Sequence, residues 1–179
     1  GAVAGKLANI ERAGGILHRC APTQVAREEA CAMVQRETGA TLVHPYTDAR
    51  VMAGQGTVVL ELLQQVPDLD AVIVPVGGGG LASGCAVALH ALKPGAHLFG
   101  AEPAGADDAF QSLHSGERVT SVVPHTICDG LRATIGEPNF TLLRERRVEV
   151  VSVDDEATLA AMRLAWTELE QTIEPSSAV

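Results

Sequence analysis

Residues 70–91 of the chain read DAVIVPVGGGGLASGCAVALHA. The apolar run at residues 71–76 predicts a strand buried on both faces, as is usual for a parallel strand flanked by helices. Four glycines follow at 77–80, and then a helix of small residues. Without Cβ atoms, the glycines let backbone N–H groups converge on one point, toward which the helix also directs its positive end. A merely flexible turn needs fewer glycines, so the order strand, glycines, helix predicts a phosphate site.

Composition limits the classes to which the protein can belong. The 179 residues are 46% hydrophobic, enough for one domain or most of one. The net charge of −9 argues against nucleic acid and anionic membranes as partners. The chain has no apolar run of membrane-spanning length, no secretory segment and no CxxC pair among its four cysteines, which we expect to be buried. We therefore predict a cytoplasmic protein that binds neither nucleic acid nor membrane.

Strand and helix patterns alternate along the chain. Apolar runs predict strands at residues 16–20, 41–44, 71–76, 97–101 and 148–153. Besides the helix after the glycines, periodicity and capping residues predict helices at 3–13, 23–38, 48–66, 107–114, 138–146 and 154–171. This alternation predicts an α/β fold with parallel sheets and helices on both faces.

Five motifs together resemble one known family. They are HPYTDARVMAGQGT (44–57), VPVGGGGLASG (74–84), GAEPAGADDAFQSL (100–113), CDGLR (128–132) and IEPSSAV (173–179). In this order, over nearly the whole chain, they are similar to the serine/threonine dehydratase and serine racemase family, which comprises pyridoxal-phosphate enzymes of the tryptophan-synthase-β fold type. The resemblance implies that residues 1–47 form the C-terminal part of a small domain and residues 48–179 part of the large cofactor-binding domain. It also implies a homodimer for the full-length protein.

The resemblance assigns cofactor-binding residues by position. The glycine segment matches the family's binding segment for the phosphate of pyridoxal 5′-phosphate. Gly130 matches a glycine that approaches the cofactor, and Glu174 matches a carboxylate near its ring. Ser177 stands where many relatives have glycine. The residues expected at the cofactor are thus Gly77, Gly78, Gly79, Gly80, Leu81, Gly130 and Glu174.

Glu102, Ala106 and Asp108 form a candidate metal site. Two carboxylates and a backbone carbonyl on one short loop offer the hard oxygen ligands that Mg²⁺ or Ca²⁺ prefers. The matching positions hold a divalent cation in the racemase and related dehydratases. The alternative is that the acidic pair Asp107 and Asp108 simply favours a helix N-terminus.

His44 and Arg27 are candidates for the substrate cleft. His44 matches a family histidine near the cleft, and Arg27 matches a cleft residue of the racemase. On the sequence alone, a packing role is the better interpretation of His44, and Arg27 is an exposed helix charge. Tyr46 stands where the racemase has a nucleotide-contacting asparagine, which argues against regulation by ATP.

The family's Schiff-base lysine has no counterpart in this sequence. It belongs to a Ser-x-Lys-x-Arg-type motif, which neither Lys6 nor Lys93 matches, so the resemblance assigns no catalytic residue here. The chain opens on GAVAGK without Met and stops at EPSSAV, inside the last matching motif. We therefore expect a fragment that is inactive by itself.

The resemblance also implies a reaction. Pyridoxal phosphate takes up the electrons left when the α-proton of an amino acid is removed. Loss of a β-hydroxyl then leads to a 2-keto acid and ammonia, so we predict an ammonia-lyase, or dehydratase, for small amino acids of the L-serine and L-threonine type. Returning the proton to the opposite face gives racemisation, and serine racemase activity is the alternative in the same family.

Two further interpretations come from other classes. Gly77-x-Gly79-x-x-Ala82 loosely fits a dinucleotide-binding fingerprint, with Glu102 about 20 residues further on, where a ribose-binding acid belongs. Against it, the glycine strand should open its domain, whereas here it follows an expected strand–helix–strand unit. A non-catalytic domain that binds a phosphate ligand is the other possibility, favoured by the absence of the lysine.

Overall fold

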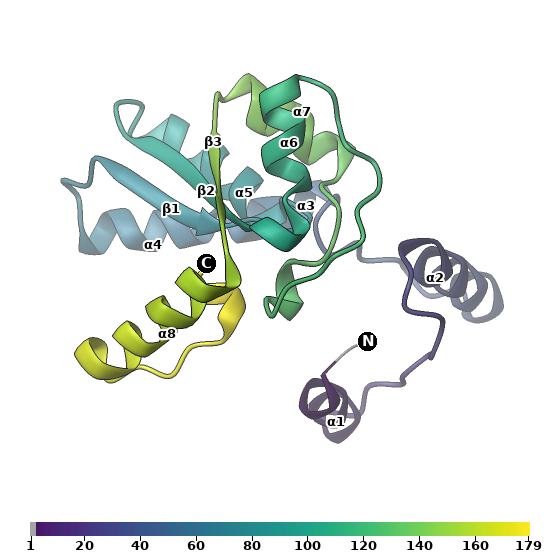
Figure 1. Cartoon of the computed structure of the whole chain (residues 1–179). Helices are drawn as coiled ribbons and strands as arrows, with labels where there is room; N and C mark the ends of the chain where they lie inside the picture. The colour runs from purple at the N-terminus through teal and green to yellow at the C-terminus, as the bar shows by residue number, and fades with distance from the viewer. Residues whose placement is uncertain (1–2) are drawn as a thin grey trace. The chain divides into compact units, whose positions relative to one another are not determined.

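The computed structural model describes residues 3–179 (Figure 1). The strands are β1 (Ala71–Pro75), β2 (His97–Pro103) and β3 (Glu149–Val153). The α-helices are α1 (Ala4–Arg12), α2 (Gln24–Thr38), α3 (Ala49–Gln55), α4 (Thr57–Gln65), α5 (Gly80–Leu92), α6 (Asp108–Ser115), α7 (Glu137–Glu145) and α8 (Asp155–Leu169). Three short 3-10 helices are η1 (Ala104–Ala106), η2 (Asp129–Leu131) and η3 (Pro175–Ser177).

The chain divides into two compact units, Gly1–Val43 and His44–Val179. This division lies a few residues before the expected domain boundary at residue 47, which stays a prediction. Across the described residues, no helix is both long and apolar enough to span a bilayer.

Helix starts predicted from capping residues are present. In each, a side-chain oxygen accepts a hydrogen bond from a first-turn N–H, which replaces a partner that the helix itself cannot supply. The pairs are Thr23 Oγ1 with Ala26 at 3.2 Å, Asp48 Oδ1 with Arg50 at 2.8 Å, and Asp154 Oδ1 with Ala157 at 2.7 Å.

The first unit contains helices α1 and α2 but no strand among its described residues. The strands predicted at 16–20 and 41–44 are therefore wrong, and so is the early strand–helix–strand unit. A strand is defined by hydrogen bonds to a neighbouring strand, and neither segment has such a neighbour here. Their apolar side chains stay exposed, Ile16 by 84% and Val43 by 64%. Cys20 and Cys31 are also exposed, contrary to expectation, because no described residue of this unit is buried.

The second unit is built on a three-stranded parallel sheet in the order β1-β2-β3. Ile73 pairs with Phe99, and Phe99 pairs in turn with Glu149. The carboxyl ends of all three strands therefore lie at one edge of the sheet. In parallel α/β sheets this is the edge at which ligands bind.

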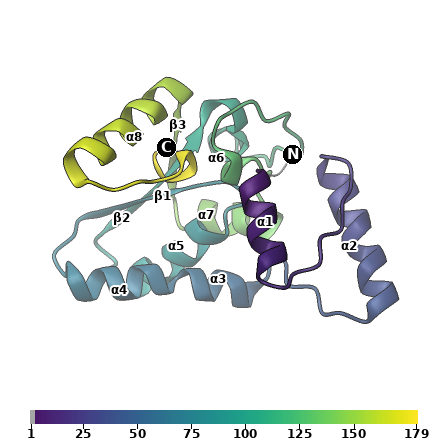
Figure 2. The same cartoon turned by 90° about the horizontal axis from the view of Figure 1, so that it is seen from below.

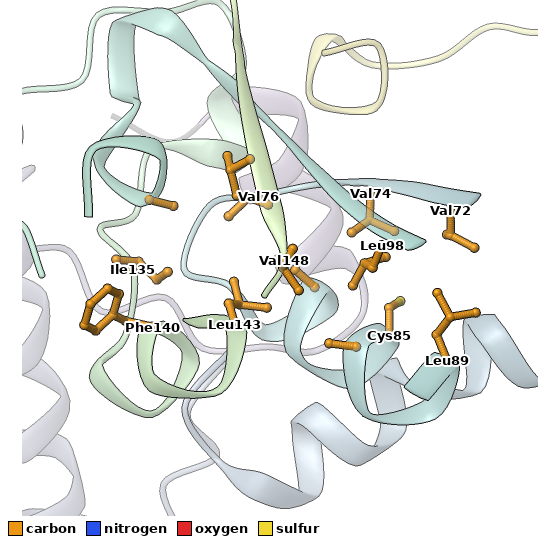
Figure 3. Close-up of a cluster of buried hydrophobic side chains, with 14 of the residues drawn as sticks. Val72, Val74, Val76, Cys85, Leu89, Leu98, Ile135, Phe140, Leu143 and Val148 are labelled. Carbon is orange, nitrogen blue, oxygen red and sulfur yellow. The ribbon is translucent and has the colours of Figure 1, made fainter. Parts of the chain in front are cut away.

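The core lies between the sheet and helix α5, as Figure 3 shows. Val72 and Val74 of β1 point into it, together with Cys85 and Leu89 of α5. Ile73, between the two valines, is 66% exposed, so the prediction that this strand is buried on both faces is wrong. Helix α8 lies on the opposite side of the sheet from α4 and α5 (Figure 2), but it leaves Ile73 uncovered. The α/β class with a parallel sheet is confirmed.

Candidate cofactor site

The glycine loop, defined here as residues 77–81, joins β1 to α5. Its start is fixed by the Val76 N–H, which donates to the Ala101 carbonyl of β2 at 2.8 Å. Gly79 has the left-handed backbone conformation, with φ of 89°, immediately before α5 begins. Glycine adopts this conformation readily, whereas an L-residue is strained in it.

The amides of the glycine loop are available to a ligand. No side chain caps α5. Among the backbone hydrogen bonds of loops, turns and helix ends in the described residues, none has its donor N–H in residues 77–81. The four glycines are buried, and Leu81 is half-buried. Buried N–H groups need partners. An anion at this point would satisfy several of them at once, and the positive end of α5 would favour it.

The loop is closely packed, which excludes a merely flexible turn. A Cβ added to Gly78 would lie 2.4 Å from ring carbons of Tyr46, and one added to Gly80 would lie 2.9 Å from the Tyr46 Cα. A Cβ on Gly79 would approach the Asn139 Cβ to 2.9 Å. The glycines are therefore required by close packing as well as by backbone conformation.

Two segments distant in sequence lie next to the loop. A Cβ on Gly77 would lie 3.5 Å from the carbonyl oxygen of Gly130, in η2. Gly130 in turn donates its N–H to Ser176 Oγ of η3 at 2.9 Å, and a Cβ on it would lie 3.7 Å from a carboxylate oxygen of Glu174. The structure thus places Gly130 beside the glycine loop and Glu174 beside Gly130, both of them exposed, and their contact with the cofactor stays a prediction.

Asn139 is a residue of this site that sequence reasoning missed. It is fully buried in the first turn of α7, and its Nδ2 donates to the Tyr46 carbonyl at 2.9 Å and to Ser83 Oγ at 3.0 Å. No motif pointed to it, because an asparagine near a helix start is typical of an ordinary cap. Its contacts come from segments more than 50 residues away, which no local pattern records.

The acidic loop, defined here as residues 102–108 from the end of β2 to the start of α6, holds two fully buried carboxylates, Glu102 and Asp108. Glu102 accepts the N–H groups of Ala109 at 3.1 Å and Phe110 at 2.8 Å, so Glu102, rather than Asp107, serves the start of α6. Asp108 Oδ2 accepts the Ile135 N–H at 2.6 Å, while its Oδ1 is buried and has no hydrogen-bond partner among the described residues.

Burial changes the ionisation of both acids. Removal from water raises the pKa of Glu102 to about 8, and the nearby Asp108 charge adds to this, although the Phe110 N–H opposes it. Burial also raises the pKa of Asp108 to about 6, against the opposing hydrogen bond from Ile135. Two buried carboxylates on one loop, one of them with a free oxygen, suit a hard cation.

The described residues contain no cluster of three or more His, Cys, Asp or Glu side chains that could hold a metal. A cation on the acidic loop would therefore need further oxygen ligands, such as the Ala106 carbonyl and water. Magnesium and calcium commonly keep water in their coordination shells. The chemistry of the available donors fits such an ion, and the metal site stays a prediction.

His44 and Arg27 belong to different units. His44 Nδ1 accepts the N–H groups of Tyr46 at 3.4 Å and Thr47 at 3.1 Å. Its ring lies edge-on to the Tyr46 ring, with centroids 4.5 Å apart. Arg27 is exposed on α2, where its Nη2 donates to Gln24 Oε1 at 2.7 Å.

Neither lysine is in the glycine loop. Lys93 follows the far end of α5, where its Nζ donates to the Pro67 carbonyl at 2.6 Å. Lys6 lies on α1, in the other unit. Because α5 has 13 residues, its two ends are about 20 Å apart.

The second unit is a parallel α/β structure. In its buried glycine loop, backbone N–H groups without protein partners could bind an anion such as a phosphate. A family model described as pyridoxal-phosphate dependent enzyme matches residues 1–179. The chain belongs to this family, and the dinucleotide-binding interpretation is set aside. Glu102 independently opposes that interpretation, because its buried carboxylate is occupied by two backbone amides and does not face a ribose.

The chain is similar to several characterised proteins. It is 42% identical over 174 residues to a serine racemase of Arabidopsis thaliana, covering 97% of this chain and 53% of that protein. It is also 42% identical over 170 residues to a beta-hydroxyaspartate dehydratase of Paracoccus denitrificans, covering 95% of this chain and 54% of the relative. A crystal structure of a threonine deaminase from T.th. superposes with a TM-score of 0.91 at 42% identity, covering 97% of this chain and 58% of that one. The chain thus spans about half the length of the curated relatives it matches.

Proposed function

We propose that the protein carrying this chain is a pyridoxal-phosphate-dependent ammonia-lyase that acts on a small β-hydroxy amino acid. The observation that carries the proposal is the glycine loop. It offers consecutive buried amides to an anion at the carboxyl edge of a parallel sheet. Family membership makes the phosphate of the cofactor the natural ligand.

Each part of the site has a distinct role in this proposal. The amides of residues 77–81 bind the phosphate, and Gly130, whose carbonyl oxygen lies next to Gly77, approaches the cofactor. Glu174, next to Gly130, would supply a carboxylate near the cofactor ring, where it would accept a hydrogen bond. When bound, pyridoxal phosphate supplies an electron sink for the charge left by removal of the α-proton.

The preferred reaction is removal of the β-hydroxyl, which yields a 2-keto acid and ammonia. Support comes from the two relatives named as a dehydratase and a deaminase. The serine racemase of Arabidopsis thaliana has the same sequence identity to the chain, 42%, and supports racemisation as the alternative reaction. Both reactions begin with loss of the α-proton, so the glycine loop serves either one.

His44 is positioned to act as a hydrogen-bond donor. Because Nδ1 accepts two backbone N–H groups, the neutral ring carries its proton on Nε2. We propose that this Nε2–H contacts an acceptor on the substrate, such as a carboxylate or hydroxyl oxygen. Arg27 stays a second candidate for the substrate cleft, and Glu102, Ala106 and Asp108 stay the proposed site for Mg²⁺ or Ca²⁺.

Two measurements test the proposal. Titration of the chain with pyridoxine 5′-phosphate, followed by ³¹P NMR, should give saturable binding that is lost in Gly79→Val; unsaturable binding would contradict the phosphate site. The protein carrying the chain should release ammonia and a 2-keto acid from L-serine or L-threonine. Formation of D-serine as the main product would favour the racemase, and binding without turnover would favour a non-catalytic ligand domain.

A further inference from the structure

Asn139 joins parts of the second unit that are otherwise separate in the chain. Its Nδ2 donates to the Tyr46 carbonyl at 2.9 Å and to Ser83 Oγ at 3.0 Å, and it lies 3.2 Å from Met52 Sδ. These three partners belong to the segment before α3, to α5 and to α3. One buried amide group therefore ties α7 to α3, to α5 and to the segment before α3.

The same side chain lies directly against the glycine loop. A Cβ on Gly79 would come within 2.9 Å of the Asn139 Cβ. Tyr46 also packs against the loop, with its ring next to Gly78 and its Cα next to Gly80. The loop is thus enclosed by Asn139 and Tyr46, and these two residues are themselves hydrogen-bonded to each other.

The chemistry of the Asn139 contacts requires an amide nitrogen. The Tyr46 carbonyl can only accept a hydrogen bond, so the Nδ2 group must face it. The Oδ1 atom is buried without a partner among the described residues, so the amide holds its orientation through its nitrogen alone. Aspartate has the same shape but no donor, and it would place an acceptor against the Tyr46 carbonyl.

We propose that Asn139 is a positioning residue for phosphate binding, because its hydrogen bonds hold Tyr46 against the glycine loop and fix the first turn of α5, in which the loop ends. The inference rests on the proposed function, because it assigns the glycine loop to a phosphate. Asn139 itself does not contact the ligand. Its amide keeps the loop closed, so that the amides of residues 77–81 converge before the ligand arrives. Preorganised donors bind more tightly than donors that must be ordered at binding.

The test compares two ligands that differ by the phosphate alone, pyridoxine 5′-phosphate and pyridoxine. Neither carries an aldehyde, so neither reacts with surface lysines. In Asn139→Asp the dissociation constant for pyridoxine 5′-phosphate should rise at least tenfold, equivalent to about 1.4 kcal/mol. The weak binding of pyridoxine should not change. Asn9→Asp adds the same charge on exposed α1 and serves as the matched control, with wild-type binding expected.

A second variant allows for poor folding of Asn139→Asp. Asn139→Ser is uncharged and too short to reach Tyr46, and it should show the same phosphate-specific loss with a cooperative melting transition. Wild-type affinity for the phosphate ligand in a folded Asn139 variant would overturn the inference, and so would equal losses for both ligands. Failure of the wild-type chain to bind the phosphate ligand would instead overturn the proposed function.

Discussion

Asp108 accepts the backbone N–H of Ile135 at 2.6 Å, and the next residue, Gly136, donates its N–H to the Gly78 carbonyl at 3.2 Å. Two consecutive amides therefore connect the acidic loop with the glycine loop. Arg118 Nη1 donates to the Ile135 carbonyl at 3.0 Å, so this peptide is held from both sides. One short segment, residues 135–136, thus contacts both loops directly.

A divalent cation should stabilise the second unit. Addition of Mg²⁺ or Ca²⁺ should raise the melting temperature, because an ion that binds the folded state alone stabilises it by mass action. Asp108→Asn should remove this increase, whereas Asp107→Asn, a neighbouring change of the same charge, should retain most of it. Equal increases in all three proteins would place the ion elsewhere.

Without a divalent cation, stability should decrease as the pH rises. The folded pKa of Glu102, about 8, exceeds its ordinary value of 4.5, so the folded state retains a proton that the unfolded state releases. The stabilisation is fully present below pH 4.5 and is lost as the pH rises toward 8. With a chelator present, the melting temperature should fall on the order of 5 °C between pH 5 and pH 8.

Glu102→Gln provides the comparison for this pH dependence. Glutamine has the same shape and does not titrate, so its melting temperature should vary less over the same range. Glu61→Gln, on an exposed carboxylate, should keep the wild-type slope. A slope unchanged in Glu102→Gln would show that another group is responsible.

Asp155 should control the order of the segment that carries Gly130. Its carboxylate accepts Thr126 Oγ1 at 2.6 Å and the Ile127 N–H at 3.1 Å, which fixes the chain just before η2. Asp155→Ala should destabilise the protein by about 1–2 kcal/mol. Hydrogen exchange at residues 127–131 should also become faster, as measured by mass spectrometry. The exposed neighbouring residue offers a control, because Glu156→Ala should leave that exchange unchanged.

Gly79→Ala should weaken both stability and phosphate binding. The left-handed conformation at φ of 89° costs about 1–2 kcal/mol for an L-residue, and the new Cβ would lie 2.9 Å from Asn139. Chemical denaturation and ³¹P NMR measure the two effects. Gly95→Ala, where the added Cβ would meet nothing within 4 Å, should behave like wild type in both. A Gly79→Ala protein with unchanged phosphate affinity would contradict the assigned role of the loop.

The sequence by itself determined the α/β class, the strand–glycine loop–helix order and the positions of helix starts. These features depend on neighbouring residues: the order of strand, glycines and helix at 71–91, and capping side chains such as Thr23, Asp48 and Asp154. Capping bonds form within one turn, so a local pattern is enough to predict them. The family resemblance added Gly130, which lies next to Gly77, and Glu174, which lies next to Gly130; their contact with the cofactor stays a prediction.

The tertiary structure alone decided which elements are covered and which distant residues act together. The segments at 16–20 and 41–44 have strand-like sequences, but without a neighbouring strand among the described residues they form none. Ile73 is exposed because burial depends on what packs above the sheet, which the sequence of β1 does not encode. Asn139 reaches Tyr46 across 93 positions, and Asp108 reaches Ile135 across 27. Such contacts arise from chain folding rather than from local spacing, and for that reason no motif could have predicted them.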